Sequence, residues 1–314
     1  MKSQPWWQKK EEIMRKVILF ILMLCLMAFL VRAGDFPVKE SEAIKKEFKF
    51  EGGAQPQTFE IDNVFGSINV TGYSGSVVKL SAQKTIRAKS KEALQRAKEE
   101  VTLDISSEGN TVVLFVDGPF RGIKGCINWN TRKTGYIVQY DFEVKVPRKT
   151  GLLLKTVNKG DIDVSDVEGK SIVKNVNGKI TINNLKGDFE VHTVNGKIKM
   201  DAVTGSGEAH TVNGKVAVSF DKNPGSDCSF HTINGKLDVT FLSGLSADFK
   251  LKTFNGKIYS DFPSTYLPAA ASRGKRQSGK YVYKSSRFQG IRIGAGGPTI
   301  KMDTLNGNIF ISKR

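Results

Sequence analysis

A short phrase of the form Val-Asn-Gly-Lys recurs through the second half of this chain and constrains its fold more strongly than any other feature. Its asparagines are spaced by 19, 18, 18, 21 and 21 residues between Asn158 and Asn255. A fixed period of this kind is typical of stacked units that cannot bury an apolar face alone. The copies occupy residues 157–160, 176–179, 194–197, 212–215, 233–236, 254–257 and 305–308.

Each repeat predicts two short strands. After Gly196, polar and apolar residues alternate, so Ile198 and Met200 lie on one face of a strand and two lysines on the other. A second strand is predicted at residues 188–192, after a Lys-Gly turn. Alignment of the repeats therefore produces two apolar columns. The first contains Ile162, Ile180, Ile198, Val216, Leu237 and Ile258, and the second contains Val173, Val191, Ala209, Phe230 and Leu251.

Two architectures fit these columns. In a parallel β-solenoid each repeat is one coil, and equivalent residues stack about 4.8 Å apart. In an antiparallel meander each Asn-Gly pair is a type I′ hairpin turn, and each repeat lies beside its non-equivalent half. The solenoid explains the uniform columns. We therefore predict an all-β fold with a parallel β-solenoid (β-helix) of about 18 to 21 residues per coil over residues 148–260.

Asparagine suits the corners of such a solenoid because it tolerates left-handed backbone geometry, and glycine follows it freely. Stacked asparagine side chains can also hydrogen-bond along the stack. These asparagines are therefore interpreted as structural corners and not as ligands. The predicted ladder contains Asn177, Asn195, Asn213, Asn234 and Asn255.

The flanking regions are less regular. Residues 40–147 predict a β-rich region with strands at 48–50, 57–61, 67–70, 77–82, 101–105, 111–116 and 136–146. One short helix is predicted at 90–100, with Ser90 as its N-cap. Residues 63–68 look like a degenerate early copy of the repeat, and Pro147 marks the end of the region. Residues 261–314 are predicted to hold a basic loop at 272–280 and a C-terminal capping repeat.

The first 33 residues predict a signal peptide. An uninterrupted apolar run occupies residues 17–31, with Arg15 and Lys16 before it and Ala33 after it. As a helix this run is about 22 Å long, which is shorter than the roughly 30 Å hydrocarbon core of a membrane. We therefore expect export to the periplasm or the cell surface, including secretion, and no permanent membrane span.

The charge balance indicates the kind of partner. The formal net charge is +17, and removal of residues 1–33 takes away six basic and two acidic residues, which leaves +13. An exported protein this basic favours anionic polysaccharide, lipopolysaccharide or other partners in the cell envelope, including envelope proteins. Nucleic acid is not expected after export.

One column of lysines is the candidate binding surface. Each of these lysines directly precedes an inward aliphatic residue, so alternation turns all of them outward. The alternative is that they keep the chain soluble and protect strand edges from aggregation. The column contains Lys179, Lys197, Lys215, Lys236 and Lys257.

The three histidines of the chain, His192, His210 and His231, occupy one position of successive repeats and are expected to form a ladder. Imidazoles about 5 Å apart could share a Zn or Cu ion. The same column holds Lys155 and Lys174, together with Lys252, which favours an outward polar position instead. No metal and no cofactor is predicted.

No catalytic motif is recognisable, so we predict a non-catalytic protein. One alternative is a polysaccharide-processing β-helix enzyme that uses Arg273, Lys275 and Arg276 with Asp261. Another is a periplasmic sensor or scaffold for a membrane protein. Cys126 and Cys228 permit one disulfide, but Cys228 aligns with the inward Phe189 and Phe249, which favours a buried thiol.

Residues 45–314 resemble the bacterial adhesin-like β-strand-repeat family catalogued as domain of unknown function 4097. The resemblance is carried by Gly-Ser-Ile-Asn-Val at 66–70, the strand ending Val146-Pro147, Leu-Leu-Leu-Lys-Thr-Val-Asn at 152–158, and the serial Thr-Val-Asn-Gly-Lys-Ile units. It implies an exported repeat protein with a solenoid-like fold. The family has no assigned activity, so the resemblance implies no catalytic residues.

Overall fold

The protein is described here by a computed structural model that covers residues 36–52, 56–122, 127, 131–268, 275–277, 280–282 and 288–314. The predicted signal peptide, residues 1–33, lies outside the described residues. The described helices are α2 (Lys91–Glu100) and α3 (Thr131–Thr134), and neither has the length and hydropathy that crossing a membrane requires. Almost all remaining structure is strand, which confirms the predicted all-β class.

Two large sheets, called sheet A and sheet B, contain 11 and 12 strands. In spatial order, sheet A contains β1 (Val38–Lys49), β4 (Val77–Ala88), β7 (Tyr136–Pro147), β3 (Ile68–Tyr73), β9 (Ile162–Glu168), β11 (Ile180–Lys186), β13 (Ile198–Thr204), β15 (Val216–Lys222), β17 (Leu237–Phe241), β25 (Ile309–Lys313) and β19 (Ile258–Ser260). Sheet B contains β20 (Thr265–Leu267), β23 (Gln289–Ile293), β18 (Ala247–Asn255), β24 (Thr299–Asn306), β16 (Cys228–Asn234), β14 (Gly207–His210), β12 (Phe189–His192), β10 (Ser171–Lys174), β8 (Thr150–Lys155), β2 (Gln57–Asp62), β6 (Thr111–Asp117) and β5 (Thr102–Glu108). A separate antiparallel pair joins β21 (Lys275–Gln277) to β22 (Lys280–Val282).

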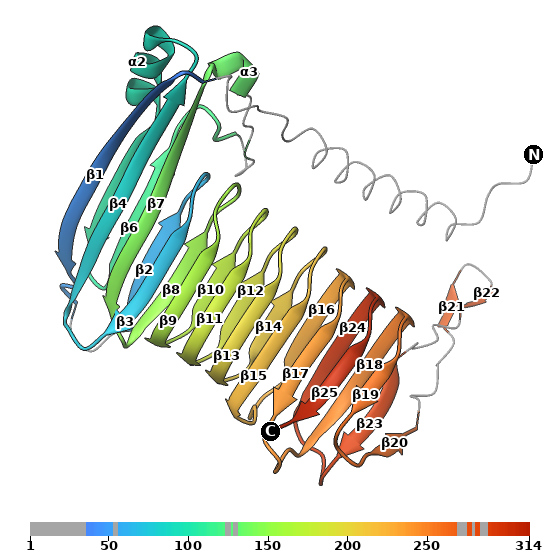
Figure 1. The fold of residues 1–314 in the computed structure, drawn as a ribbon. Helices are drawn as coiled ribbons and strands as arrows, with labels where there is room; N and C mark the ends of the chain where they lie inside the picture. The colour runs from blue at the N-terminus through green and yellow to red at the C-terminus, as the bar shows by residue number, and fades with distance from the viewer. Residues whose placement is uncertain are drawn as a thin grey trace, which may run out of the picture.

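Successive repeats add one strand to each sheet. Thus β8, β10, β12, β14 and β16 follow one another in sheet B, and β9, β11, β13, β15 and β17 do so in sheet A, always in parallel pairs. Figure 1 shows the resulting stack of coils, which runs from the green strands to the orange ones. The parallel pairing excludes the antiparallel meander for these repeats.

The core lies between the two sheets. Ile180, Ile198 and Val216 are completely buried, and backbone register places each beside the equivalent residue of the next coil. The predicted columns are therefore correct, with one change. In sheet A, Ile309 lies between Leu237 and Ile258. In sheet B, Met302 lies between Phe230 and Leu251.

This change corrects the predicted capping role of the last repeat. Strands β24 and β25 do not lie at the end of the stack but between the fifth coil, β16–β17, and the sixth, β18–β19. In Figure 1 the red strands accordingly stand between orange ones. After β17 the chain continues into β18 and β19, which lie one position further along the stack. The position between the two coils is occupied by β24 and β25, which come later in the sequence. The end of sheet B is instead made by the antiparallel strands β23 and β20.

The N-terminal end is also out of sequence order. The predicted early copy of the repeat is present, because β3 pairs with β9 and Phe65 bridges to Asn158. This coil, β2–β3, lies between β6–β7 and β8–β9. Strands β4 and β1 extend sheet A in antiparallel pairs. The predicted helix is confirmed as α2, and Ser90 Oγ accepts a hydrogen bond from the Ala93 amide at 3.2 Å.

The glycines of the repeat have a different purpose from the one predicted. Neither Gly178 nor Gly196 has a positive φ, and the asparagines before them do not have one either. A Cβ atom at Gly196 would instead lie 2.0 Å from the carbonyl oxygen of Gly178 in the neighbouring coil. Glycine is therefore needed because the coils approach closely, and left-handed geometry occurs elsewhere. Within the described part of the chain, the non-glycine residues with positive φ are Lys159, Asp166, Asn184 and Ala202.

We expect Gly196→Ala to destabilise the protein by about 1–3 kcal/mol, because the added methyl group meets a backbone atom that cannot rotate away. Gly244→Ala is the matched control, since its Cβ would meet nothing within 4 Å. This control is expected to change the free energy of unfolding by no more than about 0.5 kcal/mol. Urea unfolding of both variants measures the difference, and equal midpoints would contradict the close-approach explanation.

Candidate functional site

The asparagines of the repeats form one continuous ladder at the corner of the stack. From Asn177 onward, each Nδ2 donates to the Oδ1 of the asparagine in the adjacent coil, at 2.7–2.9 Å, and Asn158 accepts the first of these bonds. Every interior amide thus uses a donor and an acceptor within the stack, which supports a structural role. In spatial order the ladder contains Asn158, Asn177, Asn195, Asn213, Asn234, Asn306 and Asn255.

The lysines of the candidate column directly precede strands β11, β13, β15, β17 and β19 of sheet A. Aspartates form ion pairs with three of them. Lys179 Nζ lies 3.5 Å from Asp161. Asp238 accepts from both Lys215, at 2.8 Å, and Lys236, at 3.4 Å. Partial burial opposes ionisation of Asp238, yet the hydrogen bonds from these two lysines outweigh it and lower its pKa. The column is therefore partly neutralised.

Two lysines of the column differ from the others. Among the described residues, no ion pair holds Lys197 or Lys257, and both are exposed. Register also places Asn308 between Lys236 and Lys257, because the last repeat is inserted there. The alternation of the sequence could show that these side chains face outward, but not that Asp238 comes between two of them.

The net positive charge is concentrated in the C-terminal part of the sequence. Residues 261–314 contain ten basic and two acidic residues, so they supply +8 of the +13 that remains without residues 1–33. On the outer face of sheet B, Lys301 lies beside Lys250 in register. Lys301 and Lys252 both lie over the ring of Phe288, at 5.3 and 5.5 Å. This cluster of lysines could not be predicted from the sequence, because Lys301 is brought beside Lys250 only by the pairing of β24 with β18.

A groove of about 540 Å³ lies at the same end, between β18, β19, β20 and β23. Lys252, Lys257, Tyr259 and Tyr266 contribute to its lining. The side chain of Tyr266 is 73% exposed, and Tyr259 stacks on Phe310 with ring centroids 4.9 Å apart. Exposed aromatic rings beside lysines offer a ligand both apolar surface and positive charge. We call this the end groove.

The histidines form a second polar column on the outer face of sheet B. Register places His210 between His192 and His231, with ring centroids 5.0 and 5.8 Å away. Acidic residues alternate with them: Glu208 Oε1 lies 3.1 Å from His192 Nε2, and Asp303 Oδ2 lies 3.6 Å from His231 Nδ1. Burial lowers the pKa of His210 and of His231, and the neighbouring carboxylates offset this only in part.

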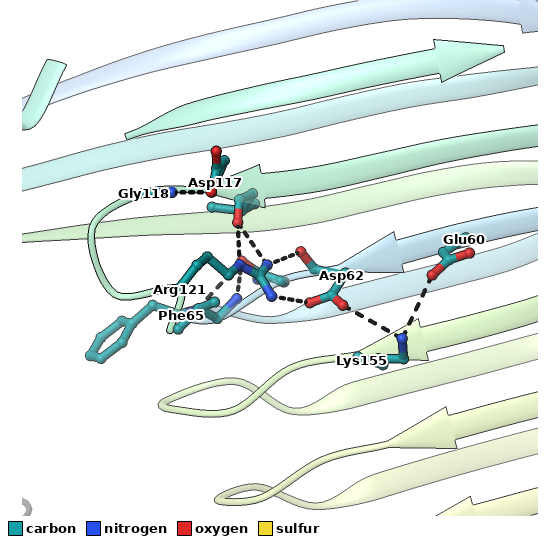
Figure 2. Close-up of polar contacts among 10 residues, drawn as sticks. Glu60, Asp62, Phe65, Asp117, Gly118, Arg121 and Lys155 are labelled. Atoms are coloured by element: carbon teal, nitrogen blue, oxygen red, sulfur yellow. Dashed lines mark hydrogen bonds and ion pairs between the residues drawn. The ribbon is translucent and has the colours of Figure 1, made fainter. Parts of the chain in front are cut away.

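Toward the N-terminal end, the column that contains the histidines continues through Lys174 to Lys155 and Asp62. There Asp62 forms ion pairs with Arg121 and Lys155 (Figure 2). Arg121 Nη1 donates to Asp62 Oδ1 at 2.8 Å, and its Nε and Nη2 donate to the carbonyl of Val116. Its guanidinium lies 4.2 Å from the centroid of the Phe115 ring. Lys155 reaches Asp62 at 3.5 Å, and also Glu60. These charges satisfy one another and hold the loop after β6, so the cluster is structural.

The residues of the alternative enzyme hypothesis are not brought together among the described residues. Asp261 Oδ2 accepts a hydrogen bond from the backbone amide of Lys313 at 3.0 Å, which gives this carboxylate a structural role. Arg273 lies outside the described residues, as do the side chains of Lys275 and Arg276. Cys228 is buried, and burial raises the pKa of its thiol, while Cys126, the other cysteine of the permitted disulfide, lies outside the described part.

No protein-family profile matches the sequence, and no curated protein matches it significantly. Similar solved structures include a candidate cell adhesion protein from Clostridium sporogenes, with 13% identity, 87% of this chain and 100% of that chain covered, and a TM-score of 0.30. Others are a candidate lipid-binding protein from Parabacteroides distasonis (10%, 86% and 96%, 0.34) and a candidate adhesin from Bacteroides fragilis (11%, 87% and 97%, 0.36). At such identities and TM-scores, neither family nor function follows for this chain.

Proposed function

We propose that this chain is an exported, non-catalytic β-solenoid that binds anionic polysaccharide, including the sugar portion of lipopolysaccharide, through its C-terminal end. The observation that carries this proposal is the end groove, whose lining includes Lys252, Lys257 and the exposed tyrosines Tyr259 and Tyr266. Aromatic faces pack against the apolar faces of sugar rings, and ammonium groups attract carboxylate, sulfate or phosphate substituents.

The charge distribution supports this end of the molecule over the other. At the N-terminal end, Arg121 and Lys155 are held by Asp62 and Glu60. At the C-terminal end, Lys250, Lys252 and Lys301 lie together on sheet B, and Lys257 is exposed on the edge of sheet A. The predicted lysine column leads along sheet A toward the same end. A long anionic polymer could therefore contact the groove first and the column beyond it.

A Lys252→Gln/Lys257→Gln variant is expected to bind immobilised heparin roughly 5- to 30-fold more weakly than the parent chain. This range corresponds to two partly screened charge contacts of about 0.5–1 kcal/mol each. Retention of the parent should also fall as ionic strength rises. Both positions lie on the surface, so the melting temperature is expected to stay nearly unchanged.

Two further variants locate the surface. The triple change of Lys197, Lys215 and Lys236 to Gln tests the lysine column. The triple change of Lys39, Lys46 and Lys91 to Gln is the control, because it removes three charges from the opposite end, as many as the column variant and one more than the groove variant. We expect the column variant to weaken binding less than the groove variant, and the control least. Equal effects of the groove and control variants, or no heparin binding by the parent at 0.15 M salt, would overturn the proposal.

A further inference from the structure

We propose that His192, Glu208 and His210 bind one divalent transition-metal ion on the outer face of sheet B, between β12 and β14. This inference is independent of the end groove and of polysaccharide binding. It begins with a sequence pattern in which Glu-x-His occurs in two successive repeats, at residues 190–192 and 208–210. Residues two apart on a strand face the same side, so each pattern places a carboxylate and an imidazole together.

The strand pairing brings the two patterns into contact. Parallel register sets His192 beside His210 and Glu190 beside Glu208. The Glu208 carboxylate lies between the two imidazoles, with Oε1 3.1 Å from His192 Nε2 and Oε2 3.8 Å from His210 Nε2. The three ligand atoms lie within 4.8 Å of one another. Both ring nitrogens therefore face the same carboxylate from adjacent, rigid strands.

These separations suit a metal ion. Zinc binds imidazole nitrogen and carboxylate oxygen at about 2.0–2.2 Å in a tetrahedral arrangement, which puts neighbouring ligand atoms about 3.3 Å apart. The separation of 3.1 Å between His192 Nε2 and Glu208 Oε1 is already close to this value, and His210 Nε2 lies 3.8 Å from the other carboxylate oxygen, Oε2. Small side-chain rotations close the remaining distance, because all three side chains are partly exposed, by 28–42%. The exposed side leaves a fourth position open to water or another ligand.

Lys174, Glu190 and Ser229 surround the proposed site. Lys174, which register places beside His192, pairs with Glu190 at 2.6 Å, and the same Glu190 oxygen lies 3.6 Å from His192 Nε2. Ser229 Oγ lies 3.2 Å from the same nitrogen, His210 Nε2, and this hydrogen bond is given up when the nitrogen binds an ion. Two imidazoles with one carboxylate suit Zn²⁺, Cu²⁺, Ni²⁺ or Co²⁺, whereas Ca²⁺ and Mg²⁺ prefer oxygen ligands alone.

His231 provides an internal control. It occupies the same column in the next coil, but its Nδ1 faces Asp303 at 3.6 Å and not Glu208. A variant at this position removes an imidazole of the same kind and similar exposure from outside the assigned ligand set. It therefore separates a built site from general attraction of metal ions to surface histidines.

The test uses tag-free chain stripped with a chelator and titrated with Co²⁺ by visible absorbance and with Zn²⁺ by calorimetry. We expect one ion per chain and the intense visible bands of tetrahedral Co²⁺. His192→Gln/His210→Gln should lose more than about 100-fold in Zn²⁺ affinity, since changes outside the ligand shell alone cost 10- to 100-fold. His231→Gln should bind as the parent does. Glu208→Gln should weaken binding and alter the Co²⁺ spectrum.

Metal-free melting curves and circular dichroism establish that each variant is folded, which the partial exposure of these side chains predicts. The proposal is overturned if the parent binds no ion, or if the folded double variant binds Zn²⁺ as the parent does. It is also overturned if His231→Gln loses affinity as strongly as the double variant, because the ligand set would then differ from the one assigned.

Discussion

Ile198→Asp is expected to lower the free energy of unfolding by about 4–5 kcal/mol or more, which is a large part of the 5–15 kcal/mol typical of a folded protein. Ile198 is completely buried, with Ile180 and Val216 on either side of it in the middle of the stack. The variant loses the transfer free energy of the isoleucine and places a carboxylate between two sheets, without a partner. We therefore expect a much lower melting temperature or failure to accumulate as soluble protein.

Lys197→Asp is the matched control, because the same new side chain then occupies the preceding, exposed residue. Its effect on the free energy of unfolding is expected to stay within about 0.5 kcal/mol. Thermal unfolding followed by circular dichroism compares the two variants with the parent. If both melt alike, residues of the Ile198 column do not point into the core.

Removal of residues 299–314 is expected to release the C-terminal end of the stack. The deletion takes away β24 and β25, which join the sixth coil to the fifth through parallel pairs on both sides. Four buried apolar side chains are lost with them, worth about 1.5–3 kcal/mol each. These are Ile300, Met302, Ile309 and Ile311.

The effect should be local. In a repeat stack each coil contacts only its neighbours, so residues 148–241 should remain folded while residues 242–298 become susceptible to protease. Limited proteolysis with mass spectrometry maps the boundary. Deletion of Arg314 alone serves as the control, since it removes a surface ion pair with Asp221 and none of the four core side chains. Protection of residues 242–298 in the long deletion would show that β18–β19 can stack directly on β16–β17.

Alternation and period were sufficient to predict the strands, the inward columns and the helix capped by Ser90, because these depend on neighbours in sequence. The order of coils at the two ends was not predictable in this way. Each repeat presents nearly the same strand edges, so Leu237 could accept Ile258 or Ile309 equally well as its next neighbour. In the structure Leu237 pairs with Ile309, and β18 pairs with β24 on one side and antiparallel with β23 on the other.

Features between coils were equally hidden. That Gly196 must lack a Cβ depends on the carbonyl of Gly178, which lies 18 residues earlier. The partner of Lys215 is Asp238, which lies in the following coil. For the histidines, a signal was present in the sequence: the two Glu-x-His patterns recur one repeat apart, and a parallel stack necessarily brings such patterns together.

The interior coils are interchangeable in a way that the ends are not. The coils beginning at β10, β12 and β14 contact their neighbours through the same asparagine ladder, the same close glycine approach and the same register, apart from a register shift between β13 and β15. Duplication of one 18-residue unit would therefore lengthen the stack by about 4.8 Å and leave the strand order at both ends unchanged. The number of repeats in the chain would therefore set the distance between the basic C-terminal end of the stack and the N-terminal end, where Arg121 and Lys155 are paired with carboxylates.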